Sequence, residues 1–103
     1  MSKYHARKTE VDGIVFDSKK EALRYRELLL LQRAGVIKGL RMQVPYTLIE
    51  KSKYGREIKY VADFVYRENE EMVVEDTKGI KTPVYRLKKR LLAEIYGIEI
   101  KET

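Results

Sequence analysis

The chain has 103 residues, a formal net charge of +6 and no cysteine. This length predicts one domain, residues 1–103, because two domains would each lack an adequate core. The lack of cysteine excludes a disulfide scaffold and any zinc or iron–sulfur site with cysteine ligands. No apolar run approaches the roughly 18–20 residues of a membrane helix, and no secretory signal opens the chain. We therefore expect a soluble cytoplasmic protein, whose basic surplus weakly favours a polyanionic partner such as nucleic acid.

The chain is expected to begin with a basic arm over residues 1–9 and a β-hairpin over 10–17. Asp12-Gly13, flanked by apolar residues, is typical of a type I′ hairpin turn. Residues 18–103 are then expected to form the core.

A first helix is predicted directly after the hairpin. Ser18, followed by Glu21 three residues later, has the pattern of a capping box at a helix N-terminus. Gly35 is expected to end the helix as its C′ residue.

Three strands joined by short turns are predicted next, as an antiparallel meander over Gln43–Ile49, Glu57–Tyr66 and Met72–Thr77. Pro45 places the first of them near an edge or a strand start. The turns are expected at 53–56 and 68–70.

A second helix is predicted to begin with Thr82 as N-cap and Pro83 at its first position, and to end at Gly97. Apolar residues recur at helical spacing and are expected to pack on the sheet: Val84, Leu87, Leu91, Leu92 and Ile95. Ile98–Ile100 is expected as a last short strand. The predicted fold is thus an α/β domain with an αβββαβ core behind a β-hairpin.

Two acidic residues stand in unusual places. Asp63 lies in the middle of the most strand-like segment, where a buried carboxylate is costly without a partner or a metal. Asp76 lies near the end of the next strand and shares a face with Lys78, whereas Glu75 points the other way. Alone, Asp63 fits a solvated or ion-paired position, and Asp76 with Lys78 fits a surface ion pair.

Together, the two aspartates suggest a metal site. The short turn between their strands could bring Asp63 beside Asp76. Two carboxylates in contact repel each other, so one must take up a proton unless a cation lies between them. Hard oxygen ligands of this kind suit Mg²⁺ or Mn²⁺.

Asp63, followed thirteen residues later by Asp76-Thr77-Lys78, resembles the signature of the PD-(D/E)XK nuclease superfamily. The αβββαβ core of that superfamily matches the predicted order. The chain also looks like small phage-encoded members, through residues 60–64 and 73–79. Ala62 stands where the signature often has proline.

The resemblance implies that Asp63, Asp76 and the carbonyl of Thr77 bind Mg²⁺ or Mn²⁺. It implies that Lys78 orients or helps to deprotonate the attacking water and stabilises charge in the transition state. The superfamily commonly adds a glutamate from the first core helix. Glu21 fits this position, with Glu27 as the rival, although the capping box alone also explains Glu21.

Two further side chains are candidates for the site. Some relatives place a glutamine like Gln43 near the site, although an ordinary polar strand residue explains it equally well. Glu75 could replace Asp76, but its spacing to Lys78 does not suit a shared face.

Charge is unevenly distributed along the second half of the chain. Residues 68–76 contain five acids and no base, and residues 81–90 contain five bases and no acid. The bases are candidates for binding a phosphate backbone: Lys81, Arg86, Lys88, Lys89 and Arg90. A solvated helix face is the alternative explanation for them.

These observations predict a metal-dependent endonuclease that hydrolyses phosphodiester bonds, with DNA, branched or non-specific, as substrate. We expect it inside a bacterial cell, where a phage or bacterial enzyme acts, and a homodimer would allow it to cut both strands. The alternatives are a non-catalytic nucleic-acid-binding module that retains the fold, and a structural phage protein whose charges only solvate it.

Overall fold

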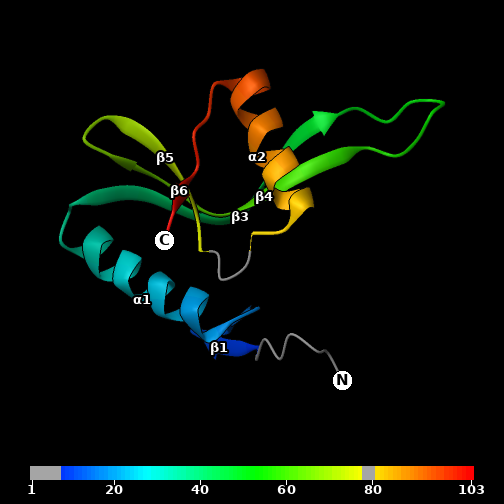
Figure 1. Cartoon of the computed structure of the whole chain (residues 1–103). Coiled ribbons are helices and arrows are strands. Elements are labelled where there is room, and N and C mark those ends of the chain that lie inside the picture. The colour runs from blue at the N-terminus through cyan, green and yellow to red at the C-terminus, as the bar shows by residue number, and fades with distance from the viewer. Residues whose placement is uncertain (1–7, 78–80) are drawn as a thin grey trace.

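The computed structural model describes residues 8–77 and 81–103, and Figure 1 shows the arrangement of their helices and strands. The elements in chain order are β1 (Thr9–Val11), β2 (Ile14–Phe16), α1 (Lys19–Arg33), β3 (Ile37–Ile49), β4 (Ile58–Glu68), β5 (Glu71–Asp76), α2 (Pro83–Tyr96) and β6 (Lys101–Glu102). The predicted αβββαβ order behind a β-hairpin is confirmed.

The turn and cap predictions around the hairpin and α1 are confirmed. Asp12 and Gly13 both have positive φ, at 52° and 78°, as a type I′ turn requires. Ser18 Oγ accepts a hydrogen bond of 3.1 Å from the backbone N–H of Glu21. Gly35 follows the C-cap residue with φ of 79°. Local chemistry therefore determines where α1 begins and ends.

The larger sheet has the strand order β3-β4-β5-β6. The first two pairings are antiparallel, as the meander predicts, and β6 pairs with β5 in parallel. Asn69 and Glu70, both with positive φ, form the tight turn between β4 and β5. The last strand forms at Lys101–Glu102 and not at Ile98–Ile100, because the earlier residues bridge the distance from the end of α2 to the end of β5.

The two helices cover opposite sides of the sheet (Figure 1). On the α1 side, Tyr25 and Leu28 pack with Phe64, Tyr66 and the hairpin residues in one buried cluster. On the α2 side, Tyr85 and Leu92 pack with a second cluster. It also contains Leu48, Tyr60, Ala62, Val65, Val74 and Ile100.

Strand β3 changes its buried face at Gln43. Met42 packs against the α1 cluster, whereas Val44, two residues later, packs against the α2 cluster. In a regular strand these two residues would share a face. Gln43 has φ of 53°, a left-handed conformation that is costly for a residue other than glycine and that interrupts the alternation.

Strand β4 shows the same exchange opposite Gln43. Ala62 belongs to the α2 cluster and Phe64 to the α1 cluster, so the change of face falls at Asp63.

The strand that we expected to begin at Gln43 is β3, which begins at Ile37. Gly39, with φ of 64°, and a bulge between Lys38 and Arg41 break the alternation that a sequence pattern would detect.

The prediction for the packing face of α2 is wrong in part. Its fully buried residues are Tyr85 and Leu92, whereas Val84 and Leu87 remain 61% and 59% exposed. Leu92 is buried as expected, Leu91 packs against the same cluster, and the hydroxyl of Tyr85 donates a 2.6 Å hydrogen bond to Glu102 in β6. Across residues 8–77 and 81–103, no helix has the length and apolar character needed to cross a membrane.

Candidate metal site at the ends of the central strands

The candidate site forms where β4 and β5 run side by side. Phe64 pairs with Glu75, so one further step along this antiparallel register places Asp63 opposite Asp76. Asp63 is 8% exposed and Asp76 is fully buried. The Asp76 carboxyl group lies close enough to Asp63 to raise the pKa of Asp63 through hydrogen bonding and charge. The contact predicted from the short turn is therefore present.

The environment of Asp63 favours its protonated form. Burial, the hydrogen bond with Asp76 and the charge of Asp76 raise the pKa of Asp63 to about 8. The charge of Glu21 adds to this rise, and the backbone N–H of Thr77, which donates to Asp63 Oδ2 at 2.9 Å, opposes it. A compensating positive charge at this place, either a proton or a metal ion, would stabilise the pair.

Tyrosine hydroxyls surround the pair on the α2 side. The Tyr60 hydroxyl donates a hydrogen bond of 2.5 Å to Asp76 Oδ2. Burial and this hydrogen bond raise the pKa of Tyr60 well above its usual value, so it remains a donor at neutral pH. The Tyr85 hydroxyl, also with a raised pKa because of burial and its bond to Glu102, lies close enough to sense the charges of Asp63 and Asp76.

The structure distinguishes between the two glutamates considered for α1. Glu21 is buried in the first turn, and its Oε2 lies 3.4 Å from Nε2 of Gln43. Its charge acts on Asp63. Glu27 is largely exposed and lies 3.7 Å from Arg24 in an ion pair. Of the two glutamates, Glu21 is therefore the one that lies near the aspartate pair, and Gln43 is its neighbour.

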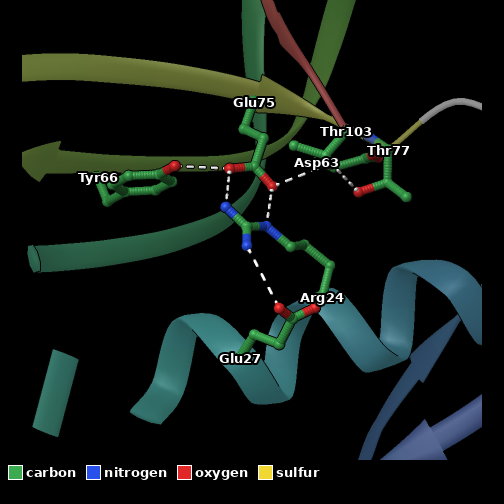
Figure 2. A network of polar contacts seen from close by, with 7 residues as sticks. All are labelled: Arg24, Glu27, Asp63, Tyr66, Glu75, Thr77 and Thr103. Atoms are coloured by element: carbon green, nitrogen blue, oxygen red, sulfur yellow. Dashed lines mark hydrogen bonds and ion pairs between the residues drawn. The ribbon is translucent and has the colours of Figure 1, made fainter. Parts of the chain in front are cut away.

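Glu75 lies on the α1 side of the sheet, where it cannot replace Asp76. Arg24 binds it with two hydrogen bonds, Nε to Oε2 at 2.6 Å and Nη2 to Oε1 at 2.9 Å (Figure 2). The Tyr66 hydroxyl donates to Glu75 Oε1 at 2.6 Å. Burial raises the pKa of Glu75, but the bonds from Arg24 and Tyr66 outweigh it, so the net pKa is lowered and the carboxylate stays charged.

A chain of threonine contacts connects this ion pair to Asp63 (Figure 2). The Thr103 hydroxyl donates to Glu75 Oε2 at 3.3 Å and lies 3.0 Å from the hydroxyl of Thr77. The backbone N–H of Thr77 in turn binds Asp63. The position of Asp63 thus depends on α1, β5 and the C-terminal segment together.

Hard divalent cations prefer oxygen donors, and such donors are present in the carboxylates of Asp63, Asp76 and Glu21. The raised pKa of Asp63 indicates that two negative charges at this place need a compensating positive charge. Within the two described segments, no three acidic or histidine side chains already lie close enough to hold a metal together. The pair fits as two ligands, and Glu21 would have to shift to become a third.

The predicted phosphate-binding residues have different environments. Lys81 and Lys89 form ion pairs with Glu102, at 3.1 and 3.3 Å. Together with the hydroxyl of Tyr85, they lower the pKa of Glu102 to about 2. Arg90 lies 3.9 Å from Glu94, and Arg86 is exposed. Lys88 is half-buried.

Lys78, the predicted catalytic lysine, lies outside the described residues, so its side chain is not placed. Two side chains that bind buried carboxylates were not predicted: Tyr60, which donates to Asp76, and Arg24, which binds Glu75. Their signals are weak. Tyr60 is one of several aromatic residues in a β-rich segment, and Arg24 is one of many basic residues on a helix.

The model of one protein family matches the whole chain, residues 1–103, and its description is "Protein of unknown function (DUF1064)". The protein belongs to the DUF1064 family. Neither the curated proteins nor the solved structures contain a significant match to the chain. The family match therefore assigns no activity to this DUF1064 protein.

Proposed function

We propose that this DUF1064 protein is a divalent-metal-dependent nuclease related to the PD-(D/E)XK superfamily, and that it hydrolyses phosphodiester bonds in DNA. The proposal is carried by the contact between Asp63 and Asp76, two buried carboxyl groups on adjacent strands. Such a pair is unfavourable when both groups are ionised and becomes favourable when a cation binds them. The αβββαβ order of the elements around the pair also supports a relation to the PD-(D/E)XK superfamily.

Each residue has a distinct role in this proposal. Asp63 and Asp76 bind Mg²⁺ or Mn²⁺ with the carbonyl of Thr77, and Glu21 completes the site directly or through water. When bound, the cation supplies Lewis-acid stabilisation of the phosphate and lowers the pKa of a coordinated water. Tyr60 and the Thr77 N–H hold the two aspartates in place through the bonds described above. Lys78 orients the water.

The nucleic acid is held by positive charge next to this site. Arg86 is exposed near the start of α2, and Lys81, Lys88, Lys89 and Arg90 stand on or beside the same helix. Backbone phosphates compete with Glu102 for Lys81 and Lys89. A homodimer acting inside a bacterial cell would allow both strands of a duplex to be cut.

A second function is supported by the raised pKa of Asp63. A proton shared with Asp76 stabilises the pair without any metal, as a non-catalytic nucleic-acid-binding module would need. This module would bind DNA equally well with and without divalent cations. It would produce no cleavage.

One experiment separates these functions. Purified protein is incubated with supercoiled, linear, single-stranded and branched DNA in Mg²⁺, Mn²⁺ or EDTA. We expect cleavage only with a divalent cation, and a loss of at least a hundred-fold in Asp63→Asn, Asp76→Asn and Lys78→Ala. Glu71→Gln, which removes an exposed carboxylate from the same strand as Asp76, is the matched control and should retain activity. Activity that survives Asp76→Asn would overturn the site, and binding without any cleavage would support the module.

A further inference from the structure

The connection between β3 and β4 extends beyond the sheet as a separate arm (Figure 1). We call residues 50–59, which are the connection and the first two residues of β4, the hairpin arm. Strand pairing ends at Ile49 and Ile58, and every residue from 50 to 59 is exposed. An arm of this kind adds little to a core, so stability alone does not explain it.

The tip of the hairpin arm has a defined shape. Ser52 and Gly55 exchange two backbone hydrogen bonds, of 3.0 and 3.2 Å, which makes Lys53 and Tyr54 the central residues of a tight turn. The N–H of Tyr54 also donates to Ser52 Oγ at 3.1 Å. The turn therefore presents the side chains of Lys53 and Tyr54 from a fixed backbone.

Tyr54 is an exposed aromatic ring at the end of this arm. It is 87% exposed, the most exposed of the large hydrophobic side chains in the described segments. The ammonium group of Lys53 lies 5.1 Å from the centre of its ring. An aromatic ring left in water beside a cation has the two properties that bind nucleotides, a stacking surface and a charge for the adjacent phosphate.

The charge of the hairpin arm also suits a polyanion. It has four basic side chains, Lys51, Lys53, Arg56 and Lys59, and two acidic ones. In the described segments none of the four bases forms an ion pair. One of the two acids, Glu57, accepts a hydrogen bond from Thr47 at 3.1 Å. The exposed side chains of Ile49 and Ile58, paired across the base of the arm, add apolar surface for sugars and bases.

We propose that the hairpin arm binds DNA that contains unpaired bases, with Tyr54 stacking on one base and the four basic residues contacting the adjoining phosphates. Stacking requires a base whose face is free, and this selects single-stranded or locally opened DNA over a perfect duplex. The inference deepens the proposed nuclease function, because it names the class of substrate. The arm leads directly into β4, the strand that carries Asp63. At about 3.3 Å per residue, the chain from Tyr54 to Asp63 spans at most roughly 30 Å, or about nine nucleotides.

Fluorescence anisotropy in EDTA measures binding while metal-dependent cleavage is absent. The probes are a labelled single strand, a blunt duplex and the same duplex with an unpaired internal segment. We expect Tyr54→Ala to weaken binding about ten-fold on the two probes with unpaired bases and less than two-fold on the blunt duplex. Tyr54→Phe keeps the ring and should bind within two-fold of the wild type. A Tyr54→Ala variant that binds all three probes like the wild type would overturn the proposal.

A second comparison tests the basic residues. Replacing Lys51, Lys53, Arg56 and Lys59 by Gln should reduce the slope of log K against log salt by roughly 3 on single-stranded DNA. The control variant replaces four exposed bases outside the arm, Arg26 and Arg33 on α1 and Lys38 and Arg67 at the far end of the β3–β4 pair, and loses the same charge. An equal reduction in both variants would assign the effect to net charge and refute a role of the arm.

The two proposals fail in different ways. If the protein binds unpaired DNA through Tyr54 but never cleaves it, only the nuclease function is wrong. If it cleaves DNA with a divalent cation and Tyr54→Ala cleaves single-stranded substrates at the wild-type rate, only the hairpin-arm inference is wrong.

Discussion

Gln43 in β3 lies opposite Asp63 in the neighbouring strand β4, at the point where both strands change their buried face. Gln43 is in the left-handed conformation, and its amide lies 3.4 Å from Glu21 Oε2. Backbone strain of this kind persists where surrounding structure enforces it, and functional sites are a common place for it. Gln43, Asp63 and Glu21 thus lie together at one place in the fold.

The conformation of Gln43 predicts an unusual effect of glycine. Gln43→Gly should raise the free energy of unfolding by about 1 kcal/mol, because glycine adopts positive φ without the cost that a side chain adds. Arg41→Gly, in the same strand but at negative φ, should lower it by roughly 0.5–1 kcal/mol. Urea denaturation measures both. A destabilised Gln43→Gly would mean that the side-chain contact with Glu21 outweighs the strain.

The raised pKa of Asp63 predicts that stability falls as pH rises in EDTA. The unfolded chain releases this proton near pH 3.8 and the folded chain near pH 8, so the folded state holds more protons between these values. The contribution is complete below about pH 4 and is lost as pH approaches 8, with a slope of at most ~1.4 kcal/mol per pH unit. Thermal denaturation across this range measures it, and Asp63→Asn should flatten the curve. A wild type with no slope would contradict the protonated pair.

Divalent cations should reverse this pH dependence. At pH 8, Mg²⁺ or Mn²⁺ that binds the ionised pair stabilises the folded state and raises the melting temperature. At pH 5 the same cations compete with the shared proton and should have a smaller effect. The rise in melting temperature on adding the cation should then be equal at the two pH values in Asp76→Asn, whereas Glu71→Gln should keep the difference.

The buried ion pair between Arg24 and Glu75 predicts a strong effect of removing one partner. Arg24→Met leaves the Glu75 carboxylate buried with only hydroxyl donors and should cost about 3–5 kcal/mol of unfolding free energy. The double variant Arg24→Met/Glu75→Gln should recover part of this loss, because no charge remains buried. Glu27→Ala removes only the exposed partner of Arg24 and should cost less than ~1 kcal/mol. Equal losses in all three would contradict this assignment.

The sequence was sufficient to predict features that depend on local chemistry. The Asp12-Gly13 turn, the Ser18 cap, the Thr82-Pro83 start of α2 and its end at Gly97 are all found in the structure. Each depends on a few adjacent residues whose conformational preferences agree with the fold.

Long-range geometry was harder to predict. The contact of Asp63 with Asp76 could be anticipated because a two-residue turn sets the register between their strands. The change of face at Gln43 could not, because glutamine has no preference for positive φ and the conformation is imposed by two separate packing clusters. The partly wrong packing face predicted for α2 has a similar cause. Helical periodicity identifies an apolar stripe, but the packing of Tyr85 and Leu92 against the sheet determines which part of it is buried.

The sheet separates two half-cores, one beneath each helix, and β3 and β4 both change from one to the other at Gln43 and Asp63. Near Asp63 the halves meet at polar groups and not through a continuous apolar layer. A ligand that engages Glu21 on one side and Asp76 on the other would join the halves, so we expect its binding to slow amide hydrogen exchange in both helices at once.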